Sequence, residues 1–269
     1  MDNRPIGVFD SGLGGLTMVK KLAEYLPGED VIYLGDTGRV PYGSRSKETI
    51  IKYAKQDAAF LMGHDIKAMV IACNTVCSVA LDSLKESFKT EIYEVIGAPA
   101  KAAANITKNG KIGIIGTVAT IKSGAYEAAL KKINNDLEIY STACPLFVPL
   151  VEEGWICADD TTALSAASRY LSELKSQNVD TLILGCTHYP LLKDVLSEVM
   201  GKNVHLIDSS AETAKQAATD LKAKNLQSDK KAGTTKYYVT DSTTNFSTIA
   251  SKYLEQDVTA NVEQVNLDY

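Results

Sequence analysis

The sequence has few of the features that mark membrane or nucleic-acid-binding proteins. It contains no apolar run of about 18 residues, which is the length that a membrane span needs. Its formal net charge is −5 over 269 residues. Lys and Arg are scattered along the chain rather than clustered. Neither a nucleic acid nor a membrane surface is therefore an expected partner.

The sequence is also poor in metal-ligand patterns, with three His and five Cys. The odd number of cysteines argues against a disulfide framework. The closest pair, Cys73 and Cys77, is separated by three residues, which is not the paired spacing of a structural zinc site. We therefore expect no metal. The N-terminal MDNRPIGVFD has no basic segment followed by an apolar stretch, so the sequence predicts no signal peptide and a cytoplasmic location.

What the chain does have is an alternation of short aliphatic runs and amphipathic stretches. Hydrophobic residues make up 45% and charged residues 23%, as in ordinary globular proteins. The stretches 46–64 and 159–177 are the clearest predicted helices. Strands are predicted at 6–10, 30–36, 68–73, 92–97, 111–116, 137–144, 180–186, 204–208 and 235–240. Such alternation favours an α/β fold with parallel sheets and helices on both faces.

An internal repeat suggests two such sheets. The stretch 5–22 resembles 111–130, and in each half a strand ending in Cys follows about 60 to 70 residues later. Chance likeness between α/β units is the alternative. The repeat predicts two similar doubly wound domains related by pseudo-twofold symmetry, with the active site between them. We expect one domain to comprise 1–97 plus 209–269 and the other 98–208.

Two loop motifs lie near predicted strand ends. DSGLGGL (10–16) lacks the third glycine of a dinucleotide fingerprint and predicts instead a tight turn that opens a helix, where free N–H groups can hold an anion. A plain glycine turn is the alternative. GDTGRVPYG (35–43) is a surface loop or the rim of a polar pocket.

The motifs ACNTV (72–76) and GCTHYP (185–190) each place a cysteine where a buried strand ends. The N–H groups of a following helix predict a lowered pKa for such a thiol. One such cysteine would indicate a nucleophile with a His partner. Two cysteines in matched positions suggest a base on one face of a substrate and an acid on the other. One thiolate would remove a proton from a carbon atom and the other thiol would return a proton on the opposite side, which inverts the stereocentre. Cys77, Cys144 and Cys157 are predicted to be structural, because free Cys is mostly a small buried hydrophobe.

Three further residues are candidate partners of these thiols. His188 lies two residues after Cys186 and can relay a proton to it. Asp10, at the end of the first strand, is the matching candidate beside Cys73. Glu152 can point into the cleft and orient His188.

At these motifs the sequence resembles the glutamate racemases of the cofactor-independent aspartate/glutamate racemase superfamily. DSGLGGL, GDTGRVPYG, ACNT, GTVATIKSGAYE, CPLFVPLVEEG and GCTHYP stand in family order between residues 6 and about 210. The resemblance implies a racemase with no cofactor, in which Cys73 takes the α-proton of D-glutamate and Cys186 that of L-glutamate. It implies that D-glutamate supplies peptidoglycan synthesis.

The resemblance also implies a set of residues around the substrate. Asp10 and His188 would assist their neighbouring thiols, and Glu152 would lie near His188. The substrate-binding residues would be Asp10, Ser11, Pro41, Tyr42, Gly43, Cys73, Asn74, Thr75, Thr117, Cys186, Thr187 and His188. After ACNT the chain reads Val76-Cys77, where many members of the family have a small, alanine-rich step.

Three other functions compete with glutamate racemisation. Aspartate is the alternative substrate. A binding protein that holds a dicarboxylate would need no matched cysteines. A hydrolase with Cys186, His188 and Glu152 would leave Cys73 unexplained. A homodimer is expected, as for many soluble enzymes.

Overall fold

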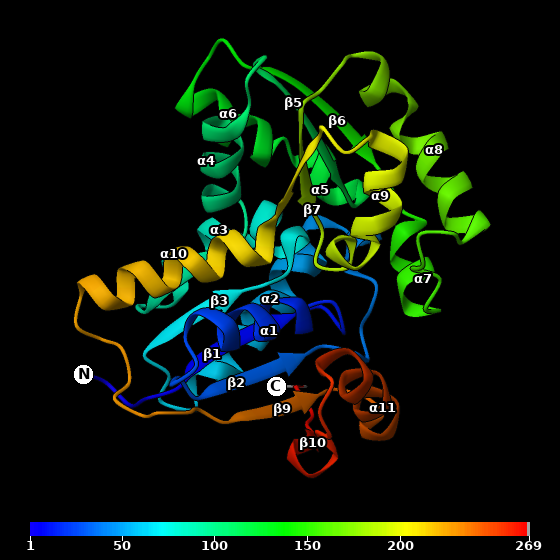
Figure 1. The fold of residues 1–269 in the computed structure, drawn as a ribbon. Helices are drawn as coiled ribbons and strands as arrows, with labels where there is room; N and C mark the ends of the chain where they lie inside the picture. Colours follow the sequence, from blue (N-terminus) through cyan, green and yellow to red (C-terminus); the bar gives the residue numbers. More distant parts are fainter. Residues whose placement is uncertain (268–269) are drawn as a thin grey trace.

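The computed structural model describes residues 1–267 as two parallel sheets with helices packed on both faces (Figure 1). Its strands are β1 (Ile6–Asp10), β2 (Val31–Gly35), β3 (Ala68–Ile71), β4 (Glu91–Glu94), β5 (Lys111–Gly116), β6 (Glu138–Ala143), β7 (Thr181–Gly185), β8 (His205–Asp208), β9 (Thr235–Val239) and β10 (Val262–Gln264). Within this range no helix is long and apolar enough to cross a membrane.

Helices follow most of the strands and connect them. They are α1 (Leu16–Tyr25), α2 (Lys47–Met62), α3 (Asn74–Ser87), α4 (Gly97–Ile106), α5 (Val118–Ser123), α6 (Ala125–Ile133), α7 (Phe147–Glu152), α8 (Thr161–Ser176), α9 (Lys193–Met200), α10 (Ser209–Ala223) and α11 (Thr243–Leu254). Short 3₁₀ turns cover Tyr42–Ser44, Tyr189–Leu192 and Thr259–Asn261.

The two sheets repeat one strand order. Sheet A runs β10-β9-β2-β1-β3-β4, and sheet B runs β6-β5-β7-β8, with parallel pairing in both. β1 lies between β2 and β3, just as β5 lies between β6 and β7. Each of these places is a topological switch point, where doubly wound proteins bind ligands beyond the carboxyl ends of their strands. This order confirms the predicted fold class of two doubly wound α/β domains.

The predicted strands all occur, within a few residues at their ends. They are aliphatic because a parallel strand covered on both faces needs apolar side chains throughout, and all five residues of β1 are buried. β10 was not predicted, since its three residues, VEQ, include two exposed polar side chains. The predicted helices 46–64 and 159–177 are α2 and α8. Asp160 caps α8 by accepting a hydrogen bond from Ala163 N at 2.8 Å.

The C-terminal part of the chain returns to sheet A. β9 pairs with β2, and β10 pairs with β9. Helix α10 packs against both α1 and α4, and in Figure 1 it runs between the two sheets. Because β9 and β10 belong to sheet A, we keep the division into one domain of 1–97 plus 209–269 and another of 98–208 as a proposal.

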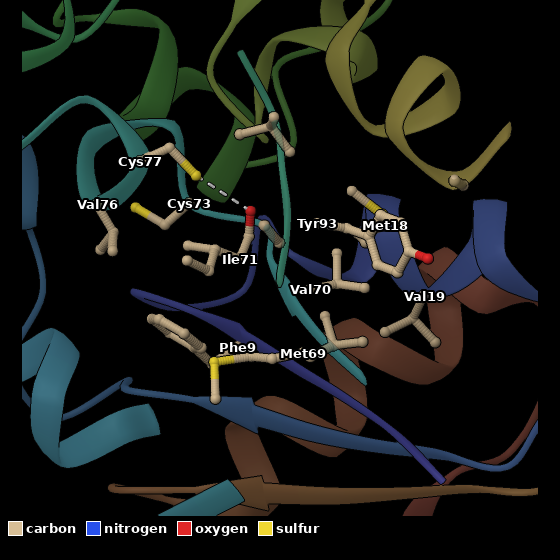
Figure 2. Packing of buried hydrophobic residues seen from close by; sticks show 14 of the residues in the cluster. Phe9, Met18, Val19, Met69, Val70, Ile71, Cys73, Val76, Cys77 and Tyr93 are labelled. Carbon is tan, nitrogen blue, oxygen red and sulfur yellow. Dashed lines mark hydrogen bonds between the residues drawn. The ribbon is translucent and has the colours of Figure 1, made fainter. Parts of the chain in front are cut away.

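The core beneath the first cysteine motif is formed by β1 and β3. Phe9, Met69, Val70 and Ile71 are fully buried there. Figure 2 shows Cys73 and Cys77 beside Ile71, at the end of β3. The Cys77 thiol donates to the Ile71 carbonyl at 3.3 Å.

The structure supports a packing role for two of the three cysteines predicted to be structural. Cys77 and Cys144 are buried, whereas Cys157 is exposed. The prediction was wrong for Cys157, because the segment between α7 and α8 lies at the surface.

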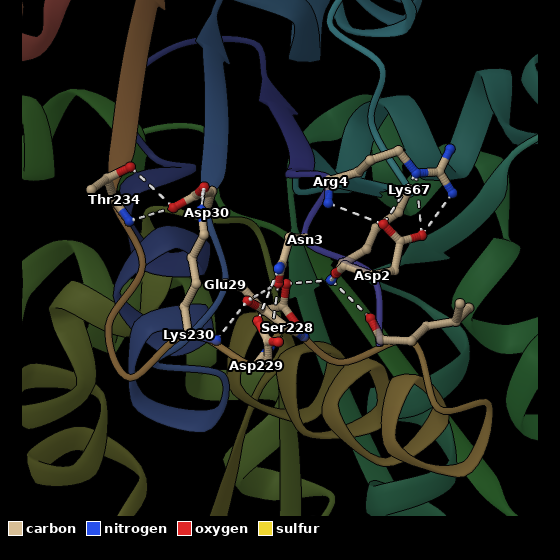
Figure 3. Close-up of polar contacts among 11 residues, drawn as sticks. Asp2, Asn3, Arg4, Glu29, Asp30, Lys67, Ser228, Asp229, Lys230 and Thr234 are labelled. Atoms are coloured by element: carbon tan, nitrogen blue, oxygen red, sulfur yellow. Dashed lines mark hydrogen bonds and ion pairs between the residues drawn. The ribbon is translucent and has the colours of Figure 1, made fainter.

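A buried ion pair fastens the N-terminal segment and the loop 225–233 to sheet A (Figure 3). Lys67 Nζ pairs with Glu29, and both side chains are almost fully buried. Lys67 Nζ also donates to Asp2 O at 2.6 Å and to Leu226 O at 2.8 Å. Glu29 accepts from Ser228 N at 2.8 Å. One cation therefore joins segments that are distant in sequence.

Replacing Lys67 with Met should destabilise the protein by about 3–5 kcal/mol, because the Glu29 carboxylate would stay buried without a counter-charge. Urea denaturation measures this loss. The matched control is Lys230→Met, since Lys230 pairs with Asp30 at the surface, where a pair is worth less than about 1 kcal/mol. Equal losses in the two variants would contradict the role assigned to the buried pair.

Candidate active site

A cavity of about 400 Å³ lies where the strands at the two switch points end. Ser11 follows β1, Cys73 follows β3, Thr117 follows β5 and Cys186 follows β7, and all four line the cavity. The volume suits a small molecule. Both sheets therefore contribute the residues after their strand ends to one site.

The structure brings nearly all of the sequence-predicted site residues together around this cavity. Those lining it are Ser11, Pro41, Tyr42, Gly43, Cys73, Asn74, Thr75, Thr117, Glu152, Cys186, Thr187 and His188. Asp10 is the exception among the described residues, and its side chain is completely buried.

The thiol of Cys186, in the second cysteine motif, has a cationic neighbour. Cys186 Sγ lies 3.8 Å from His188 Nδ1, and His188 Nε2 lies 3.2 Å from Glu152 Oε1 at the end of α7. Burial alone lowers the pKa of His188, but the hydrogen bonds with Cys186 and Glu152 outweigh it and raise that pKa to about 10. At neutral pH the ring is therefore an imidazolium, which stabilises negative charge on the sulfur beside it.

The thiol of Cys73, in the first cysteine motif, has an acidic neighbour instead. Burial, followed by the negative charge of Asp10, raises the pKa of Cys73 to about 12. A hydrogen bond to Ser11 Oγ at 3.5 Å and the N–H of Val76 act in the other direction but are weaker. The expected lowering of this pKa was wrong for Cys73. Although Cys73 does precede α3, desolvation outweighs the N–H groups of the helix.

Asp10 lies under the glycine turn rather than in the cavity wall. Its carboxylate accepts from Gly12 N at 3.0 Å and from Thr187 Oγ1 at 3.4 Å. Gly14 follows in the same turn, and a Cβ there would lie 2.2 Å from Thr187 Oγ1 and 2.6 Å from His188 Nδ1. The turn after β1 therefore needs glycine, because it packs directly on the second cysteine motif.

The loop with Pro41, Tyr42 and Gly43 is tied to the body of the protein. The Tyr42 hydroxyl lies between the buried carboxyl groups of Asp36 and Asp57. Arg39 donates to both of these groups. Burial and the charge of Asp36 raise the pKa of Asp57 well above its ordinary value. Asp36 and Asp57 thus hold Tyr42 and Arg39 in place, and the rim of the cavity is anchored from below.

Hydroxyl groups from the two domains meet in the cavity. Thr75 Oγ1 lies 3.0 Å from Thr117 Oγ1, and Thr117 also caps α5 by accepting from Thr120 N. A Cβ at Gly43 would lie 2.9 Å from the Thr117 Cβ. These groups are donors for an anionic ligand, consistent with the carboxylate expected from the sequence.

Sequence reasoning missed the apolar part of the wall. Val40, Val118, Pro145, Val148 and Pro149 line the cavity beside the polar residues. Three of them, Pro145, Val148 and Pro149, belong to the motif CPLFVPLVEEG, in which only Glu152 is predicted to face the cleft. The sequence did contain a sign of this wall, because Pro145 directly follows Cys144 at the end of a predicted strand, where cavity-lining residues are expected. Among residues 1–267, no group of three or more His, Cys, Asp or Glu side chains is arranged to hold a metal ion.

Comparison with known proteins agrees with this geometry. Residues 6–217 match the family described as Asp/Glu/Hydantoin racemase. The chain is 45% identical to a glutamate racemase from Geobacter metallireducens over 266 residues, which is 98% of this chain and 97% of that protein. The chain therefore belongs to the Asp/Glu/Hydantoin racemase family, and it is an amino-acid racemase.

Solved structures show the same fold. Glutamate racemase isoform RacE1 from Bacillus anthracis superposes with a TM-score of 0.95 at 37% identity, covering 99% of each chain. Glutamate racemase from Francisella tularensis, in complex with D-glutamate, superposes with a TM-score of 0.92 at 40% identity, covering 100% of this chain and 99% of that one.

The contrast between the two thiols predicts their order of alkylation. Cys73 and Cys186 are 4% and 5% exposed, so access is similar. In a Cys157→Ser background at pH 7.5, iodoacetamide should modify Cys73 last of the two, because only a thiolate reacts and the raised pKa of Cys73 leaves it almost entirely protonated. The rate at Cys73 should rise about tenfold per pH unit from about pH 7 to about pH 10, because its pKa of about 12 lies above that range. Peptide mass spectrometry measures both rates, and faster labelling of Cys73 at pH 7.5 would contradict the assignment.

Proposed function

We propose that this protein is a glutamate racemase that interconverts L- and D-glutamate without a cofactor. The proposal rests mainly on one observation: two cysteines, one following a strand of each sheet, line a single cavity of small-molecule size. The names of the relatives support glutamate as the substrate, and the D-glutamate bound in the Francisella tularensis structure is a second support.

The proposed reaction is a 1,1-proton transfer. In the L-to-D direction the Cys186 thiolate takes the α-proton, and the electron pair stays on the α-carbon, delocalised toward the carboxylate. The Cys73 thiol then donates its proton to the opposite face of that carbon. The D-to-L direction exchanges the two roles. The α-proton is far less acidic than a thiol, so the site must stabilise the carbanion-like state by oriented dipoles and exclusion of water.

The surroundings of Cys73 suit this residue to the role of the acid in the L-to-D direction. The Cys73 thiol carries its proton, since its pKa is about 12, and is ready to act as the acid. Cys186 lies 3.8 Å from the ring of His188, whose raised pKa keeps that ring cationic at neutral pH.

The remaining residues have supporting roles in this proposal. Glu152 keeps His188 oriented and charged. Asp10 acts on Cys73 through its charge rather than through contact with the substrate. The hydroxyl and amide groups of Ser11, Asn74, Thr75, Thr117 and Thr187, with the loop Pro41-Tyr42-Gly43, bind the two carboxylates and the amino group.

The wider context is part of the same proposal. D-glutamate formed by the enzyme would supply peptidoglycan synthesis in the cytoplasm, and the enzyme would work as a homodimer. Aspartate remains the competing substrate, with a binding protein and a Cys186 hydrolase as competing functions.

Single substitutions separate these functions. Cys73→Ala should lower racemisation of both enantiomers of glutamate at least a thousandfold, because the substrate loses the acid or base on one face. A polarimetric assay measures the loss. Cys77→Ala is the matched control, since it removes a thiol one helical turn away that packs against Ile71. A hydrolase acting through Cys186 would keep its activity in Cys73→Ala, and racemisation that survives this substitution would refute the two-thiol reaction.

A further inference from the structure

Tyr126 is a buried tyrosine that reaches both cysteine motifs, yet it does not line the cavity among the described residues. It belongs to α6, in the part of the chain that forms sheet B. Its hydroxyl donates to Asn74 Oδ1 or to Val95 O, each 2.6 Å away. Both acceptors lie in the part of the chain that forms sheet A. A side chain of one domain is therefore fixed in the other.

The first target of Tyr126 is the residue after Cys73. Asn74 is the first residue of α3 and lines the cavity. Its amide also contacts Ser209 Oγ, at 3.4 Å, at the start of α10. A buried amide held from two sides keeps one rotamer, so the face that it turns to a ligand is set by Tyr126 and Ser209. Burial raises the pKa of Tyr126 well above 10, so the hydroxyl stays a donor.

The second target is the residue before Cys186. A Cβ at Gly185 would lie 3.0 Å from Tyr126 Cε2 and 2.7 Å from Ile115 O. The absence of a side chain at Gly185 thus lets the tyrosine ring pack against the end of β7. The same side chain supports Asn74 with its hydroxyl and the Gly185–Cys186 step with its ring.

We propose that Tyr126 is a positioning residue that sets the relative placement of the two thiols across the domain boundary. The inference rests on the proposed two-thiol racemisation, because that reaction requires both sulfurs to stand on opposite sides of one carbon atom. A displacement of a few tenths of an ångström in either strand end would misalign one of the two proton transfers.

The hydroxyl and the ring can be tested separately. Tyr126→Phe keeps the ring and removes only the hydroxyl, which frees the Asn74 amide and the Val95 carbonyl. Asn74 lines the cavity, so KM for both enantiomers should rise about tenfold while kcat changes less than threefold. Tyr126→Leu also removes the ring from Gly185, so kcat should fall at least tenfold in addition. Tyr93→Phe is the control, since Tyr93 is buried and its hydroxyl has no hydrogen-bond partner in the described part of the chain. It should match the wild type.

A double-mutant cycle shows whether Tyr126 acts through Asn74. Asn74→Ala and the double variant Asn74→Ala/Tyr126→Phe should have the same KM, because the hydroxyl acts on ligand binding through Asn74. Its second partner, the Val95 carbonyl, belongs to a residue that is not among the described residues lining the cavity. An unchanged KM in Tyr126→Phe, or independent effects that multiply in the double variant, would overturn the inference while the wild type still racemises glutamate. A wild type that racemises no glutamate would refute the proposed function, and the inference with it.

Discussion

The site depends on one constraint of doubly wound sheets, namely that a crevice opens beyond the strand ends where the winding direction reverses. Sheet A reverses beside β1 and sheet B beside β5. Each crevice alone would be an ordinary α/β binding site. Because the two sheets turn these ends toward a single cavity, each places one cysteine in its wall. The pairing of thiols is thus a consequence of the repeated fold.

Within this frame the two thiols are chemically unlike. Their exposure is nearly the same, but one lies near the buried negative charge of Asp10 and the other beside the cation of His188. One fold repeated twice would give two identical sites. The difference comes from residues that the two halves do not share: Asp10 stands where the second half has Gly116, and His188, held by Glu152 at the end of α7, lies beside Cys186. An enzyme that needs an acid and a base at the same moment can use such a difference.

Local patterns were enough to predict most of the fold and most of the cavity lining. The buried strands are continuous aliphatic runs, and the cysteine motifs stand at the ends of two of them. Both features are local, so the strands and the positions of the motifs can be predicted from the sequence. β10 was missed because its polar residues carry no strand signal. The pKa of Cys73 was predicted in the wrong direction, because burial and the charge of Asp10 come from elements distant in the chain. Tyr126 stood inside a recognised motif, but its contact with Asn74 spans 52 positions and leaves no local trace.

The most direct test of the two-thiol account is hydrogen exchange during turnover. The purified protein, with no cofactor added, would be incubated in D₂O with L-glutamate and, separately, with D-glutamate. NMR would follow the α-proton of each enantiomer, and polarimetry would follow the optical rotation. The account predicts that the rotation decays to zero and that, early in the reaction, deuterium is found almost entirely in the newly formed enantiomer. Deuterium appearing equally in recovered substrate and product would indicate a single base, and absence of exchange with both enantiomers would contradict glutamate racemisation altogether.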